Sequence, residues 1–156
     1  RARPRLRALI LTDTRGNPDG DEARKGRLQT AQRVLAEGTQ VVADAMIDKA
    51  FGKSATADLK QEWHAIMSRS SPDGVAAALR AMADRPDSTG TYREIDVPTL
   101  IIVGEEDVIT PPEDARKMHA AIAGSTLEII PKAGHMAPLE RPRLVADTVR
   151  QFMTKL

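Results

Sequence analysis

Short, continuous apolar runs alternate along this chain with stretches whose apolar residues have helical spacing. The runs "ALILT" (8–12), "PTLIIV" (98–103) and "TLEII" (126–130) have strand length, and "PTLIIV" is rich in β-branched residues. Continuous apolar runs of this length are typical of strands buried on both faces, as in a parallel sheet. The pattern therefore predicts a buried strand near the start of the chain, a second buried strand at 98–103, and a third strand at 126–130.

The block between the first two strands has a different period. From Asp21 to about Pro86, apolar residues recur three or four positions apart, as Leu59 and Trp63 do. Ser71 precedes Pro72 in "SPDGVAAALRAM", where serine is a favoured N-cap and proline a favoured first helical residue. We expect about four helices here and no strand.

Beyond the second strand the chain predicts helix, strand and helix in turn. Thr110 and Glu113 are spaced as a capping box, and Gly124 marks the end of that helix. A closing helix follows in 141–156. Strands that alternate with helices through short joins predict parallel strands with right-handed crossovers. The expected fold class is therefore α/β, with an all-helical insertion.

Composition narrows the classes of function. The 156 residues carry 23 Lys and Arg against 22 Asp and Glu, a net charge of +1, which argues against a nucleic-acid binder that works through bulk electrostatics. A local exception, the alternating arginines Arg1, Arg3, Arg5 and Arg7, is interpreted as a solvated lead-in to the first strand. Cysteine is absent, which excludes a disulfide framework and a thiolate metal site.

No apolar run approaches the length of a membrane span, and no signal peptide is visible, so we expect a cytoplasmic protein without a membrane partner. The three histidines show no metal-ligand spacing. Of these, His64 and His119 lie within helical patterns and are interpreted as partly exposed. No metal or cofactor is expected.

Asp107 and His135 follow the second and third predicted strands at a similar distance. In an open parallel sheet, the loops at the carboxyl ends of the strands gather at one edge. If the two strands are neighbours, the two side chains lie within hydrogen-bonding reach. A carboxylate against one imidazole nitrogen orients the ring and stabilises the imidazolium, as the acid and base of a nucleophilic triad do. Either residue alone is more often structural, as a turn residue or helix cap.

The segments "VPTLIIVGEEDVITPPEDARKMHAAI" and "GSTLEIIPKAGHMAPLERP" closely resemble the C-terminal region of α/β-hydrolase fold enzymes. The resemblance is greatest to the small esterases and lactonases that include 3-oxoadipate enol-lactonase. It places the family's acid at Asp107, after Gly104, and its catalytic histidine at His135, before Leu-Glu-x-Pro. It covers essentially the whole chain, and implies a carboxylic ester or lactone hydrolase that needs no cofactor.

The sequence departs from the family in one respect, since a serine nucleophile normally lies in a Gly-x-Ser-x-Gly turn ahead of the acid and histidine. None of the six serines lies in such a turn: Ser54, Ser68, Ser70, Ser71, Ser88 and Ser125. We therefore expect a further segment of about a hundred residues ahead of Arg1, which contains the nucleophile and the oxyanion hole. The chain alone is predicted to be inactive. Its expected partners are that missing hydrolase piece or a second copy of the chain, besides a small ester or lactone substrate.

The resemblance also implies a division of the chain into a core strand (1–16), a helical cap (17–95) and the C-terminal part of the hydrolase core (96–156). Trp63, Met46, Met67 and Met82 are candidate substrate-lining residues of the cap, although such residues are more often core. Three alternatives stay open. The missing nucleophile could instead make this a dehalogenase or a haloperoxidase-like member, Asp13 is a reserve candidate for the acid, and the chain could be a non-catalytic fragment that acts only by association.

Overall fold

A computed structural model describes residues 6–156 of the chain. Contacts divide the chain into two compact units, one formed by Arg1–Arg15, Lys49–Ala55 and Thr89–Leu156, the other by Gly16–Asp48 and Thr56–Ser88. Arg1, Arg3 and Arg5 of the predicted lead-in lie outside the described residues.

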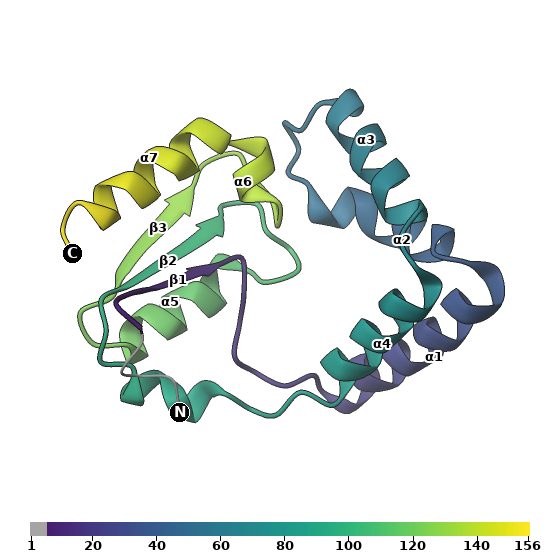
Figure 1. Cartoon of the computed structure of the whole chain (residues 1–156), viewed down its shortest axis with the longest axis horizontal. Coiled ribbons are helices and arrows are strands. Elements are labelled where there is room, and N and C mark those ends of the chain that lie inside the picture. The colour runs from purple at the N-terminus through teal and green to yellow at the C-terminus, as the bar shows by residue number, and fades with distance from the viewer. Residues whose placement is uncertain (1–5) are drawn as a thin grey trace. The chain divides into compact units, whose positions relative to one another are not determined.

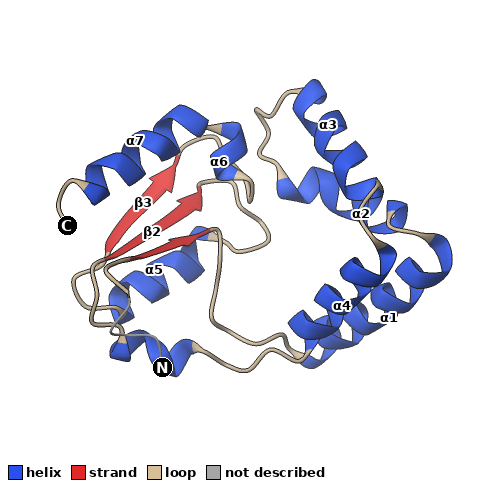
Figure 2. Cartoon of the chain, viewed as in Figure 1, coloured by secondary structure: helices blue, strands red, loops and turns tan. Residues whose placement is uncertain are grey.

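The first unit contains a parallel sheet of three strands in the order β1-β2-β3, which confirms the predicted strands and their direction. Their bounds are β1 Leu9–Thr12, β2 Thr99–Gly104 and β3 Thr126–Ile130. The helices of this unit are η2 (a 3-10 helix, Thr89–Glu94), α5 (Pro112–Ala121), α6 (Ala137–Glu140) and α7 (Pro142–Met153). Figures 1 and 2 show α5 on one face of the sheet and α7 on the other.

Alternate residues of β2 enter two separate cores, because successive side chains of a strand point to opposite faces. Leu100 and Ile102 pack with Val145 and Phe152 of α7. Ile101 and Val103 pack on the opposite face with a second group, Tyr92, Ala115, Met118 and Ile122. Every residue of β2 is buried, as predicted for a central parallel strand.

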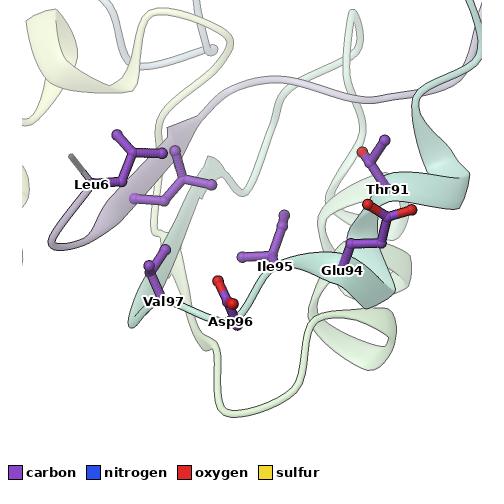
Figure 3. A pocket seen from close by; sticks show the side chains of 7 residues that line it. Leu6, Thr91, Glu94, Ile95, Asp96 and Val97 are labelled. Carbon is purple, nitrogen blue, oxygen red and sulfur yellow. The ribbon is translucent and has the colours of Figure 1, made fainter. Parts of the chain in front are cut away.

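The first strand is less buried than its sequence predicts. Leu9, Leu11 and Thr12 of β1 are only half-buried, and Ile10 is exposed, with 38% of its surface accessible. β1 pairs with β2 along one edge, and no other strand among residues 6–156 pairs with its second edge. An apolar hollow lies beside the amino end of β1, lined in part by Leu6, Leu9 and Val97 (Figure 3). It is at the opposite end of the strand from Asp13.

The second unit is helical, and the four helices predicted between the first two strands are present. They are α1 (Asp21–Glu37), α2 (Gln40–Ala50), α3 (Ala57–Ser68) and α4 (Pro72–Ala83). The hydroxyl of Ser71 accepts the Gly74 N–H, and Pro72 begins α4, as expected. α1 and α4 pack through a small core whose fully buried members are Ala31, Val34 and Ala76.

The candidate cap residues are not part of a well-buried core in this unit. Trp63, Met46 and Met67 are half-buried, and α3 contains no buried residue at all. Met82 is half-buried and packs against the core of α1 and α4. The contacts also place Lys49–Ala55 with the sheet and not with the helical unit. The assignment of 17–95 as a cap stays a prediction.

The predicted capping box at the start of α5 is wrong. α5 begins one residue later than the box requires, with Pro111 as its N-cap and no side-chain hydrogen bond at that cap. The Thr110 hydroxyl is instead donated to Asp107, at 2.8 Å. The spacing that indicated a helix cap therefore belongs to a turn that holds a carboxylate.

Candidate active site

Two neighbouring parallel strands place Asp107 and His135 at the same edge of the sheet. β2 and β3 are paired in parallel, with Gly104 opposite Ile130. The loops that leave these strands stay joined, since the Glu106 N–H donates to the Ala133 carbonyl at 2.8 Å. Nδ1 of His135 lies 2.9 Å from Oδ2 of Asp107. The structure thus brings together the two residues that the sequence selected as acid and base.

The Asp107 carboxylate is held by a short turn of its own loop. Oδ1 accepts the N–H groups of Ile109 and Thr110 at 2.8 and 2.9 Å, and Oδ2 accepts the Thr110 hydroxyl besides facing His135. The residue is buried, with 3% of its surface exposed. A buried carboxylate that accepts this many hydrogen bonds is fixed in position and keeps its charge.

Electrostatics favour an ionised Asp107 and raise the basicity of His135. Burial acts to raise the pKa of Asp107, but the hydrogen bonds from His135 and Thr110 outweigh it and hold that pKa below its usual range. The hydrogen bond to Asp107 raises the pKa of His135, against the opposing effect of burial. The carboxylate therefore stabilises the imidazolium form of His135.

The geometry also fixes which nitrogen of His135 is free. Because a carboxylate only accepts hydrogen bonds, the Nδ1 atom facing Asp107 is the one that carries the proton in the neutral ring. Nε2 makes no hydrogen bond to any of the described residues, and the side chain is 26% exposed. Nε2 is thus an available proton acceptor, on a ring whose orientation is fixed by the hydrogen bond between Nδ1 and Asp107.

The Glu140 carboxylate links the His135 loop to the segment Lys49–Ala55. Its Oε1 accepts the Gly134 N–H at 2.7 Å and its Oε2 accepts the Gly52 N–H at 2.9 Å. The Ala50 carbonyl in turn accepts the Met136 N–H at 3.1 Å. The two backbones are so close that a Cβ on Gly134 would lie 2.6 Å from the Gly52 nitrogen. The segment Lys49–Ala55 therefore forms part of the wall that positions His135.

Asp13, the reserve candidate for the acid, lies at the end of β1. Its Oδ1 accepts the Gly104 N–H at 3.0 Å, and it makes no hydrogen bond to His135. Within the described chain, Asp107 and not Asp13 is the carboxylate on Nδ1.

The remaining histidines have local partners. Nε2 of His64 lies 2.7 Å from Oδ1 of Asp44, and Nδ1 of His119 lies 2.9 Å from the Ser125 hydroxyl. Across residues 6–156, no cluster of three or more His, Cys, Asp or Glu side chains could hold a metal ion. None of the described helices is long and apolar enough to cross a membrane.

Sequence reasoning missed the parts played by Thr110 and Glu140. Thr110 was interpreted as a helix cap, although an Asp followed by Thr three residues later is also a common turn in which the side chain accepts backbone N–H groups. Sequence reasoning noted Glu140 only as the glutamate of the Leu-Glu-x-Pro motif that follows His135. Nothing in the sequence indicated that the N–H of Gly52, far away along the chain, also donates to the Glu140 carboxylate.

Comparisons with known proteins agree with this fold. Residues 2–148 match the model of the alpha/beta hydrolase family, so the chain belongs to that family. It is similar to a thermophilic esterase from Thermogutta terrifontis, with 38% identity and a TM-score of 0.96 over 99% of this chain and 58% of that one. The enol-lactonase from Burkholderia xenovorans LB400 gives 25% identity and a TM-score of 0.85 over the same shares. The expected resemblance to small esterases and lactonases is confirmed.

A sequence match to the pimeloyl-[acyl-carrier protein] methyl ester esterase of Neisseria meningitidis has 35% identity over 82 residues, 53% of this chain and 31% of that protein. The chain thus corresponds to less than two thirds of the solved structures named above, and its matches to the first curated relatives span about a third of their length or less.

Proposed function

We propose that this chain supplies the acid and the general base of a serine hydrolase that acts on carboxylic esters or lactones. The observation that carries the proposal is the 2.9 Å contact between Nδ1 of His135 and Oδ2 of Asp107, with Nε2 left free. The esterase and lactonase relatives support the class of substrate.

In this mechanism Nε2 of His135 accepts the proton of a serine hydroxyl as the oxygen attacks the acyl carbon. The imidazolium that forms is stabilised by Asp107, and it then gives its proton to the leaving alkoxide. In the second half, His135 takes a proton from water as the water oxygen attacks the acyl carbon of the acyl-serine. The imidazolium then gives that proton to the serine oxygen as the acyl–oxygen bond breaks and the carboxylic acid leaves. Asp107 stays ionised throughout, which its low pKa supports.

The nucleophile is proposed to lie outside the chain. None of its six serines follows a strand into a helix within a Gly-x-Ser-x-Gly sequence. A serine of another segment, or of a partner polypeptide, would have to reach Nε2 of His135. The half-buried β1, with its unpaired second edge in the described chain, is a surface where such a segment would add further strands. The helical unit is proposed to act as a cap over the substrate.

The test is hydrolysis of p-nitrophenyl esters and simple lactones by the complete natural polypeptide and by its His135→Gln variant. We expect measurable turnover that falls by on the order of 10³-fold or more in H135Q, because the base is lost. A matched control is His119→Gln, which removes an exposed histidine that hydrogen-bonds only locally. Turnover that is equal in H135Q and H119Q would overturn the proposal, as would no turnover of any ester or lactone.

A further inference from the structure

Asp13 combines an uncommon backbone conformation with a buried carboxyl group. Its backbone is left-handed, with φ of 45°, a conformation that non-glycine residues rarely adopt. The residue is also 9% exposed, so its carboxyl group is almost entirely removed from water. Strained, buried polar residues of this kind tend to be kept at functional sites.

The two carboxyl oxygens of Asp13 reach toward the loops that carry the candidate pair. Oδ1 accepts the N–H of Gly104, the last residue of β2. Oδ2 is buried and makes no hydrogen bond of ordinary geometry within residues 6–156. The carboxyl group also interacts with the backbone N–H of Ala137, two residues after His135. Asp13 therefore interacts with the backbone of both segments that carry the candidate pair.

The charged groups that face Asp13 are those of the candidate site. Asp107, from the loop after β2, repels its negative charge, and His135, from the loop after β3, attracts it. On its own segment, the guanidinium of Arg15 lies 4.0 Å from the Asp114 carboxylate of α5. Burial, the largest effect, raises the pKa of Asp13 to about 6.

We propose that Asp13 is a second carboxylate of this site, a positioning residue that acts on His135 through its charge and not through a hydrogen bond. Asp107 orients the ring and Asp13 adds a negative charge that favours the imidazolium form. The interaction is mutual, since the Asp13 charge contributes to the raised pKa of His135. Because Asp13 becomes ionised only as the pH rises through about 6, its support of the imidazolium is withdrawn at lower pH.

The consequence for catalysis rests on the proposed function. A negative charge held near the ring stabilises a transition state in which His135 gains a proton, even when that charge makes no hydrogen bond to the ring. Asp13 therefore makes His135 a stronger base above about pH 6, where the carboxylate is charged.

The test needs no substrate, so it stands or fails independently of the proposed function. NMR titrations would follow the aspartate carboxyl carbons and the imidazole nitrogens of the complete natural polypeptide. Asp13→Asn is the informative variant, because asparagine keeps an oxygen for the Gly104 N–H and tolerates a positive φ. The matched control is Asp147→Asn, which removes an equally charged but exposed carboxylate of α7. The His135 signal is the one that disappears in His135→Gln.

We expect one carboxyl carbon with a midpoint near pH 6, absent from D13N, and a second inflection near the same pH in the His135 curve. The His135 midpoint should move to lower pH in D13N and stay at the wild-type value in D147N. An Asp13 carboxyl that titrates with the ordinary aspartates, near about pH 4, would overturn the proposal. So would a His135 curve that is the same in D13N and wild type. If D13N does not fold, the wild-type carboxyl and imidazole curves decide by themselves.

Discussion

The imidazole Nδ1 of His135 and the carboxylate Oδ2 of Asp107 lie 2.9 Å apart, although 28 positions separate them in the sequence. The contact depends on the pairing of β2 with β3, which brings the two following loops to one edge of the sheet. It depends equally on the hydrogen bonds that fix each loop, from Thr110 to Asp107 and from Gly134 to Glu140. The pair is thus the product of local turns on a rigid sheet.

Replacing Asp107 with asparagine should reduce kcat for ester hydrolysis by on the order of 10³- to 10⁴-fold, with a much smaller change in KM. An asparagine amide can present its NH₂ to Nδ1 and stabilise the wrong tautomer, and it cannot stabilise an imidazolium by charge. Steady-state kinetics of D107N and of the control D147N would measure this. A kcat of D107N within tenfold of wild type would show that Asp107 is not the acid.

Replacing Thr110 with valine should lower kcat by about 10- to 100-fold. Valine has nearly the same shape but removes the hydroxyl that donates to Oδ2 of Asp107, so the carboxylate is less firmly oriented. Thr110→Ser retains the hydroxyl and should recover most of the activity. Equal losses in T110V and T110S would instead mean that the γ-methyl group, and not the hydrogen bond, is what matters.

Replacing Gly134 with alanine should destabilise the fold by about 3 kcal/mol, because the added methyl would overlap the backbone of Phe51 and Gly52. The matched control is Gly26→Ala in α1, where nothing lies within 4 Å of an added Cβ. That control should stabilise the protein by about 0.5–1 kcal/mol, since alanine favours a helix interior. Urea unfolding would compare the two, and an equal free energy of unfolding for G134A and wild type would contradict the tight contact with Lys49–Ala55.

The stability of Asp13→Asn should depend on pH relative to wild type. The pKa of Asp13 is raised from 3.8 to about 6, so between these values the folded protein binds more protons than the unfolded chain. Wild-type stability is therefore lowered as the pH rises through this window. D13N lacks this loss and should gain on wild type by up to about 3 kcal/mol above pH 6. Urea unfolding at about pH 4.5 and about pH 8 measures the difference, which should not be the same at the two values.

Much of the fold could be predicted because the relevant signals are local. The fully apolar run of β2 indicated a central strand, and Ser71 with Pro72 indicated the start of α4. The exposure of β1 could not be read from its sequence, since an apolar run is the same whether or not a neighbouring strand covers it.

The site was predictable in part for a similar reason. Asp107 and His135 could be selected because strand order and loop position place them at one edge. The role of Thr110 was misassigned, because its hydroxyl could serve either a helix cap or the Asp107 turn, and only the three-dimensional structure decides between them. The link from Glu140 to Gly52 spans 88 positions and leaves no periodic signal.

We propose that Asp107 and His135 serve a serine that lies outside these 156 residues. The most direct test treats the complete natural polypeptide, with any chain that copurifies, with a fluorophosphonate that labels activated serines, and identifies the labelled peptide by mass spectrometry. We predict a label on a serine outside the present sequence, formed rapidly in wild type and lost in His135→Gln. A label on any of the six serines described above, or no His135-dependent label at all, would contradict the account.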